Sequence, residues 1–263
     1  MPTIRIYLLL IAIATSLQAV KQPNILFIVS DDHGWGDLPS NWDKTEVLLP
    51  TLETLAEQGV RFSNYHTVPL CGPSRACMFT GQFSTENGMW RGPGKGPLGS
   101  PGYRGIKREV IMLSEHLSRT GYHTGCFGKW HMGSLEGEVP NDRGFDEFHG
   151  FLAGAHSYWI TPKRSKIMHN RKPDSTSEGH ATELFTGWAE QFIRESAGKD
   201  EPFFVTSPTT PCTARYVPIN RNRPLRPRPG WKRLLPEVSI SCVATMWRFW
   251  NIWITTLGNS SLS

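Results

Sequence analysis

The sequence predicts an α/β fold in which the strands of a mostly parallel sheet alternate with helices. Residues 24–29 form a continuous apolar run rich in β-branched side chains, which is typical of a strand buried on both faces. Residues 122–127 are predicted as the next strand and residues 202–206 as another buried strand, and each follows a helical pattern. Strands that alternate with helices indicate helical layers packed on a sheet.

Three segments have the apolar spacing of helices. Residues 50–58 show it first and stop at Gly59, a residue that commonly ends helices. Residues 108–119 form the second predicted helix, and residues 182–195 the third. Their expected inward-facing side chains are Val110, Ile111, Leu113 and Leu117 in the second, and Leu184, Phe185, Trp188 and Phe192 in the third.

The N-terminal residues have the pattern of an export signal. Arg5 precedes the apolar run 6–14, and small and polar residues follow at 16–19. Residues 1–19 are therefore predicted as a signal peptide, and the mature protein is expected in a periplasm, outside the cell or in a lysosome-like lumen. The alternative is a membrane anchor, but the run is shorter than the roughly 20 apolar residues of a spanning helix. We expect no membrane span after cleavage.

Cysteine content and charge exclude two other classes. The five cysteines include no Cys-x-x-Cys pair, so a zinc site is not indicated, and their odd number leaves at least one thiol unpaired. Residues 213–263 hold eight Lys/Arg and one Glu, net +7, whereas residues 1–212 hold 20 bases and 22 acids, net −2. The positive charge belongs to the Trp- and Pro-rich tail, so the net charge of residues 20–212 does not indicate nucleic-acid binding.

Reactive side chains follow the predicted strands at their carboxyl ends, where open α/β sheets bind ligands. Asp31 and Asp32 follow the first strand, and Lys129 and His131 follow the strand 122–127. Adjacent carboxylates repel each other unless something positive joins them, and a divalent cation can do so. Taken singly, these residues have structural alternatives: a turn or cap for the two Asp, a surface charge for Lys129, and a structural histidine for His131.

A cysteine stands just ahead of a short helix predicted to begin at Ser74. Pro73 suits the first turn of such a helix, because the N–H that proline lacks has no partner there. A group at a helix N-terminus meets free N–H groups that favour anions. Taken singly, Cys71 is equally a small buried residue and Arg75 a surface charge.

Four short motifs occur in one order along residues 24–211. They read NILFIVSDDHGWGD, CGPSR followed by TG, GKWHMG and RGFDEFHGF. The Cys-x-Pro-Ser-Arg element with its Thr-Gly is the signature of the formylglycine-dependent sulfatases. The chain therefore resembles this family, and most of all its arylsulfatase A and N-acetylgalactosamine-6-sulfatase branches. The resemblance covers roughly the N-terminal half of a typical member.

The resemblance implies an alkaline-phosphatase-like layered sheet with flanking helices and hydrolysis of an aryl or carbohydrate sulfate ester. It also implies that a formylglycine-generating or sulfatase-maturating enzyme oxidises Cys71 to Cα-formylglycine. One hydroxyl of the hydrated aldehyde attacks sulfur, and the second loses its proton so that the aldehyde reforms and sulfate leaves. Asp31, Asp32 and the modified Cys71 would bind Ca²⁺.

The same resemblance implies roles for four further residues. Arg75 would hold the formylglycine side chain, and Lys129 would contact the sulfate. His131 would orient the second hydroxyl and help to deprotonate it. His156, in the segment GAHSYW, would face the substrate.

The chain departs from the family pattern after the strand 202–206. Cys212 stands where members have a histidine in a Pro-His-Thr-like motif, and no SDNG-type motif with further metal ligands and a second lysine follows. We therefore expect a sheet that is incomplete on its C-terminal side and a chain of little activity. The hypothesis is a frameshift or truncation near residues 211–218, with residues 213–263 frameshifted or disordered; the alternative is a diverged short protein.

Two other function classes stay open. One is a non-catalytic sulfatase remnant or binding module that still carries formylglycine. The other is a related phosphohydrolase, against which the Cys-x-Pro-Ser-Arg motif argues, because those relatives use Thr or Ser and two metal ions.

Overall fold

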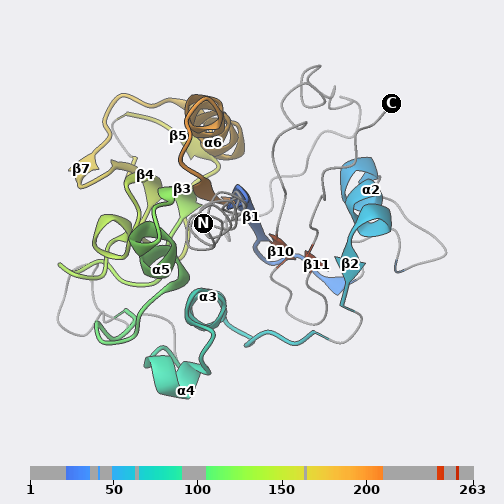
Figure 1. Cartoon of the computed structure of the whole chain (residues 1–263). Coiled ribbons are helices and arrows are strands. Elements are labelled where there is room, and N and C mark those ends of the chain that lie inside the picture. Colours follow the sequence, from blue (N-terminus) through green and yellow to red (C-terminus); the bar gives the residue numbers. More distant parts are fainter. Residues whose placement is uncertain are drawn as a thin grey trace, which may run out of the picture.

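The computed structural model describes residues 22–35, 41, 49–62, 65–90, 105–162, 165–209, 242–245 and 253–254. The predicted signal peptide, residues 1–19, lies outside the described residues. A central sheet runs through the molecule with helices on both sides (Figure 1). No helix in the described part combines the length and apolar character needed to cross a membrane.

Four parallel strands form the middle of the sheet. Their order is β1 (Ile25–Ser30), β9 (Phe203–Thr209), β3 (His123–Lys129) and β4 (Glu147–Phe151). Both β1 and β3 pair with β9 in parallel register, so their carboxyl ends open on the same edge. The structure confirms the predicted α/β class and the three predicted strands, although β3 extends to Lys129.

The sheet continues on both sides of this parallel centre. Beyond β4 lie the antiparallel strands β6 (Met168–His169) and β7 (Lys172–Pro173). Beyond β1 lie β10 (Cys242–Thr245), β11 (Trp253–Ile254) and β2 (Val60–Arg61), of which β10 is parallel to β1. A separate antiparallel pair consists of β5 (Trp159–Ile160) and β8 (Gly179–His180).

Two short segments of the tail contribute to the sheet. The strands β10 and β11 lie beyond the edge of β1 (Figure 1). Parallel register with β1 satisfies backbone groups that an open edge would expose. The remaining residues of 213–263 lie outside the described part of the chain.

Helices cover the two faces of the sheet. The helices are α2 (Pro50–Gln58), α3 (Cys71–Thr80), α4 (Ser84–Asn87), α5 (Leu113–Arg119) and α6 (Ala181–Ala197), with a 3-10 turn η3 at Pro140–Asp142. One core joins α3 and α5 to one face, and a second core joins α2 and α6 to the other (Figure 1). Successive residues of β9 divide between the cores: Phe203 and Val205 enter the second, and Phe204 the first.

Two helix starts differ from the prediction. The second predicted helix begins at Leu113 rather than at residue 108, and Ile111 and Leu113 are 39% and 37% exposed while Met112 is fully buried. The Met112 N–H donates to Glu115 Oε2 at 2.8 Å, which caps the later start. The helix α3 begins at Cys71 rather than at Ser74, because the Ser74 N–H already donates to Leu70 O at 3.0 Å.

Candidate active site

Five of the predicted site residues converge near the carboxyl ends of β1 and β3. Asp31 directly follows β1, Lys129 is the last residue of β3, and His131 lies two residues further on. Cys71 and Arg75 stand one helical turn apart in α3, so they share one face of that helix. The parallel pairing of both strands with β9 is the reason that these distant segments meet.

A buried ion cluster forms the floor of the site. Asp31 Oδ2 accepts hydrogen bonds from Lys129 Nζ and from Arg75 Nη2, the latter at 3.3 Å, and Arg75 Nη1 donates to the Lys129 carbonyl at 2.9 Å. All three side chains are at most 2% exposed. Burial alone would raise the pKa of Asp31, but the charges of Arg75 and Lys129 outweigh it and lower that pKa.

The cluster holds two cations and one anion, so it carries a formal charge of +1. Among the described residues, the buried Arg75 Nε has no hydrogen-bond partner. A buried positive charge with an unused N–H is unfavourable unless an anion joins it. The cluster is thus suited to an anion that binds at Arg75.

Cys71 and His131 are in direct contact with each other. Cys71 Sγ lies 3.2 Å from His131 Nδ1, and the thiol is half-buried. Burial, together with the charges of Lys129 and Arg75, lowers the pKa of His131 to about 3. The imidazole is therefore neutral and can accept a hydrogen bond from the group at position 71. Because Cys71 lies in the first turn of α3, its side chain also meets the positive end of the helix dipole.

The segment after β4 packs against the imidazole of His131, which the sequence analysis did not foresee. The backbone of His131 donates to Leu152 O at 3.2 Å. A Cβ on Gly154 would lie 2.5 Å from His131 Nε2, so only glycine lets the chain pass this close. Nothing in the sequence distinguishes Gly154 from the other glycines.

His156 stands two residues beyond Gly154 and is held by backbone groups. Its Nδ1 lies 2.9 Å from Ser157 O, and its Nε2 accepts from the Lys166 N–H at 3.3 Å. Its ring also packs against Phe151 with centroids 5.2 Å apart. A substrate contact through His156 would have to displace one of these bonds, so the predicted substrate role stays a prediction.

The predicted calcium ligands do not form a complete cation site within the described residues. Asp31 is committed to Lys129 and Arg75, and Asp32 is exposed with a backbone φ of 53°. No three His, Cys, Asp or Glu side chains of the described ranges are placed to hold one metal ion. Calcium prefers six to eight oxygen ligands, so Asp31, Asp32 and residue 71 are too few by themselves. Residues 210–213, with Cys212, lie outside the described part.

Known proteins with similar sequences include arylsulfatases. Human arylsulfatase G is 38% identical to this chain over 131 residues, which are 49% of this chain and 24% of that protein. The arylsulfatase of Klebsiella aerogenes is 34% identical over 144 residues, 53% of this chain and 30% of that protein. Each match thus spans less than a third of the length of the curated relative.

Solved structures agree with the fold. The crystal structure of Ps i-CgsB superposes with a TM-score of 0.64 and 30% identity, over 74% of this chain and 46% of that one. The protein BT4656, solved in complex with its substrate D-glucosamine-2-N,6-O-disulfate, superposes with a TM-score of 0.55 and 28% identity, over 73% of this chain and 35% of that one. The model of the sulfatase family matches residues 23–210, which is more than half of the 263 residues, and the chain therefore belongs to the sulfatase family.

Proposed function

We propose that the protein hydrolyses sulfuric esters at the site around Cys71. The observation that carries this proposal is the buried cluster of Asp31, Arg75 and Lys129, whose net positive charge and unused Arg75 Nε lie on the same side of α3 as the nucleophile position. A sulfate ester is an anion whose negative charge moves toward the leaving oxygen as the bond to sulfur breaks. Fixed positive groups in a dry site stabilise that charge.

Formylglycine at position 71 belongs to the same proposal. Cys71 stands in CGPSR, and its half-buried side chain lies 3.2 Å from His131, so a hydrated aldehyde fits the position. That group would supply a geminal diol, one hydroxyl for attack on sulfur and one for release of sulfate. His131 Nδ1 would accept the proton of the hydroxyl that faces it, while Arg75 and Lys129 hold the sulfate oxygens.

Calcium is a further part of the proposal. Asp31 and Asp32 are adjacent in the sequence and carry carboxylate oxygens, the type of ligand that Ca²⁺ prefers. The remaining oxygens would have to come from outside the described residues, so no chemical step is assigned to the metal.

The relatives support a proposal for the substrate, and the CGPSR motif supports one for the maturing enzyme. We propose an aryl or carbohydrate sulfate as substrate, since the names of the relatives include arylsulfatases and BT4656 acts on a sulfated glucosamine. A formylglycine-generating or sulfatase-maturating enzyme would modify Cys71 during export. We also keep the hypothesis of a frameshift or truncation near residues 211–218, which the net charge of +7 in residues 213–263 supports; resequencing the gene from the codon of Asp200 onward tests it.

Paired substrates test the function. The full chain is coexpressed with a maturating enzyme, the peptide containing residue 71 is checked for the aldehyde by mass spectrometry, and turnover of an aryl sulfate is compared with that of the matching aryl phosphate. We expect slow turnover of the sulfate, in keeping with the incomplete motif set, and loss of that turnover in Cys71→Ala. Faster turnover of the phosphate would identify a phosphohydrolase, and an aldehyde without turnover of either ester would identify a non-catalytic remnant.

A further inference from the structure

His131 has a backbone conformation that its surroundings must enforce. Its φ is 60°, in the left-handed region that residues with a Cβ rarely adopt. In this conformation its imidazole Nδ1 lies 3.2 Å from Cys71 Sγ. A strained residue of this kind persists only where neighbouring groups hold it. The question is which side chain holds the turn that follows β3.

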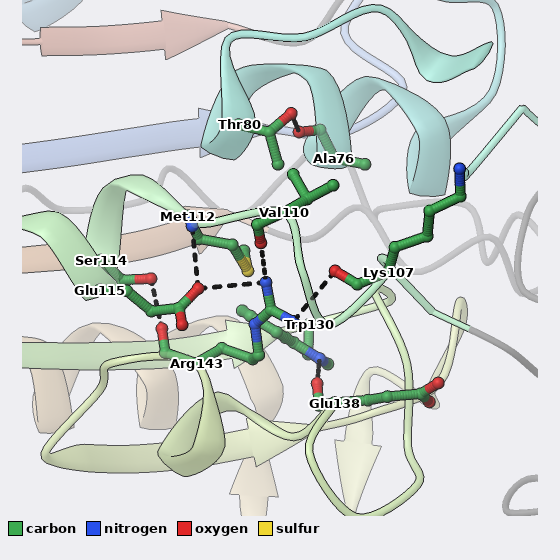
Figure 2. A network of polar contacts seen from close by, with 10 residues as sticks. All are labelled: Ala76, Thr80, Lys107, Val110, Met112, Ser114, Glu115, Trp130, Glu138 and Arg143. Carbon is green, nitrogen blue, oxygen red and sulfur yellow. Dashed lines mark hydrogen bonds and ion pairs between the residues drawn. The ribbon is translucent and has the colours of Figure 1, made fainter. Parts of the chain in front are cut away.

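Glu138 makes the contacts that close this turn. Its Oε2 accepts hydrogen bonds from the N–H groups of Ser134 and Leu135, both at 3.0 Å, and its Oε1 accepts from the Gly105 N–H at 3.0 Å. Its backbone carbonyl accepts from the indole Nε1 of Trp130 at 2.9 Å, a contact visible in Figure 2. One residue thus binds the chain immediately before His131 and shortly after it.

Packing leaves little freedom between these contacts. A Cβ on Gly133 would lie 2.6 Å from the Cβ of Glu138, so the two residues are in close contact. The Ile106 N–H donates to Met132 O at 3.2 Å, which fastens residues 105–106 to the other side of the turn. The carboxylate of Glu138 therefore joins residues 134–135 to residues 105–106, and both segments adjoin residues 132–133.

The residues that follow 105–106 in the chain are anchored by the buried side chain of Arg143. Arg143 Nη1 donates to Lys107 O at 3.4 Å, and Nη2 donates to Val110 O (Figure 2). Arg143 Nη2 also pairs with Glu115 at 3.1 Å. Residues 107–110 thus form a fixed support, and Glu138 transmits that support to the turn of His131.

We propose that Glu138 is a positioning residue that holds His131 in the left-handed conformation and directs its imidazole at position 71. Glu138 lies at the end of no predicted strand and in none of the four motifs, so the sequence alone does not single it out. Its effect on turnover rests on the proposed function, but its effect on the geometry of His131 does not. The two can be tested separately.

The geometric test uses the ring nitrogens of His131 in the full chain with unmodified Cys71. In protein labelled with ¹⁵N-histidine, the Nδ1 resonance is assigned from its loss in His131→Ala. Its displacement by Cys71→Ala then measures the contact with the thiol. We expect that displacement to fall well below its wild-type value in a Glu138→Gln background, because the turn that directs the ring at position 71 is then less firmly held. Glu138→Gln keeps the shape of the side chain but loses the charge and one acceptor oxygen.

Glu136→Gln is the matched control, because Glu136 is an exposed acid of the same turn, and it should leave the displacement unchanged. The ring resonances of His149, which bonds to Asp174 at 2.7 Å, report whether the fold is intact. An equal displacement in the wild type and Glu138→Gln, with His149 unchanged, overturns the proposal. If Glu138→Gln does not fold, Glu138→Asp keeps the charge and should show a partial loss; a full displacement there overturns the proposal as well.

The matured protein provides the second readout. Glu138→Gln should lower kcat for an aryl sulfate while leaving KM unchanged, because the anion contacts of Arg75 and Lys129 remain. Absence of turnover in every variant would refute the proposed function and leave the NMR result to decide the role of Glu138. Equal kcat in the wild type and Glu138→Gln would overturn the positioning role.

Discussion

Removal of the buried carboxylate of Asp31 should destabilise the protein and at the same time strengthen its binding of sulfate. In the wild type, Asp31 offsets Arg75 and Lys129 and leaves a formal charge of +1; Asp31→Asn leaves +2 on side chains that are 2% exposed. Breaking a buried ion pair from one side costs about 3–5 kcal/mol. This is a large part of the roughly 5–15 kcal/mol by which domains are stable. An anion that binds only the folded state should restore part of the lost free energy of unfolding. The gain is about 2.7 kcal/mol when the anion concentration is a hundred times its Kd.

The assay is urea unfolding with and without sodium sulfate, at constant ionic strength set with sodium chloride. Asp32→Asn is the matched control, because Asp32 is the adjacent acid and is exposed. We expect the free energy of unfolding to fall by about 3–5 kcal/mol in Asp31→Asn and by less than about 1 kcal/mol in Asp32→Asn. Sulfate should stabilise Asp31→Asn more than the wild type. Equal stabilisation of both by sulfate, or a small loss in Asp31→Asn, would refute the account of the charged floor.

Three further predictions concern contacts outside the Asp31 cluster. Gly154→Ala should lower kcat by about tenfold or more with a small change in melting temperature, because its Cβ would lie 2.5 Å from His131 Nε2; aryl sulfate kinetics measure this. Arg143→Met should lower the free energy of urea unfolding by about 3 kcal/mol, since the buried guanidinium, which donates to two carbonyls and pairs with Glu115, is lost, and Arg143→Lys should recover only part. His149→Phe should flatten the pH dependence of stability between about pH 7 and pH 5.

The contacts of His149 determine whether the protein gains or loses stability as the pH falls. Burial lowers the pKa of His149 below the ordinary 6.5, although the hydrogen bond that its Nε2 donates to Asp174 opposes the shift. A group with a lowered pKa in the folded state makes folding less favourable as pH falls below its unfolded value, so the wild type should lose stability on acidification. Burial alone would raise the pKa of Asp174, but hydrogen bonds led by that of Ser177 lower it instead. The contribution of Asp174 is therefore lost only below its ordinary 3.8. A wild-type slope retained in His149→Phe would contradict this assignment.

Much of the local structure could be predicted because it depends on neighbouring residues. The helix α2 (Pro50–Gln58) has its predicted bounds, and α6 and three central strands lie within a few residues of theirs. Periodic apolar spacing and end signals act over a few residues, so they can be read along the chain. The start of α5 was predicted wrongly, because the carbonyls of Lys107 and Val110 bond to the distant Arg143 instead of starting a helix.

The sequence by itself determined the family and the choice of Cys71, Arg75, Lys129 and His131 as candidate site residues, since these depend on short motifs. It also determined the alternation of strands and helices, since this depends on local apolar spacing. Only the tertiary structure decided which of these groups meet. The strand β9, late in the chain, lies between β1 and β3 and so brings Asp31 to Lys129 across 98 positions of sequence. The left-handed turn of His131 and its support by Glu138 likewise arise from contacts between segments. Strand order and close packing are set by the sum of many distant contacts, and no local pattern records that sum.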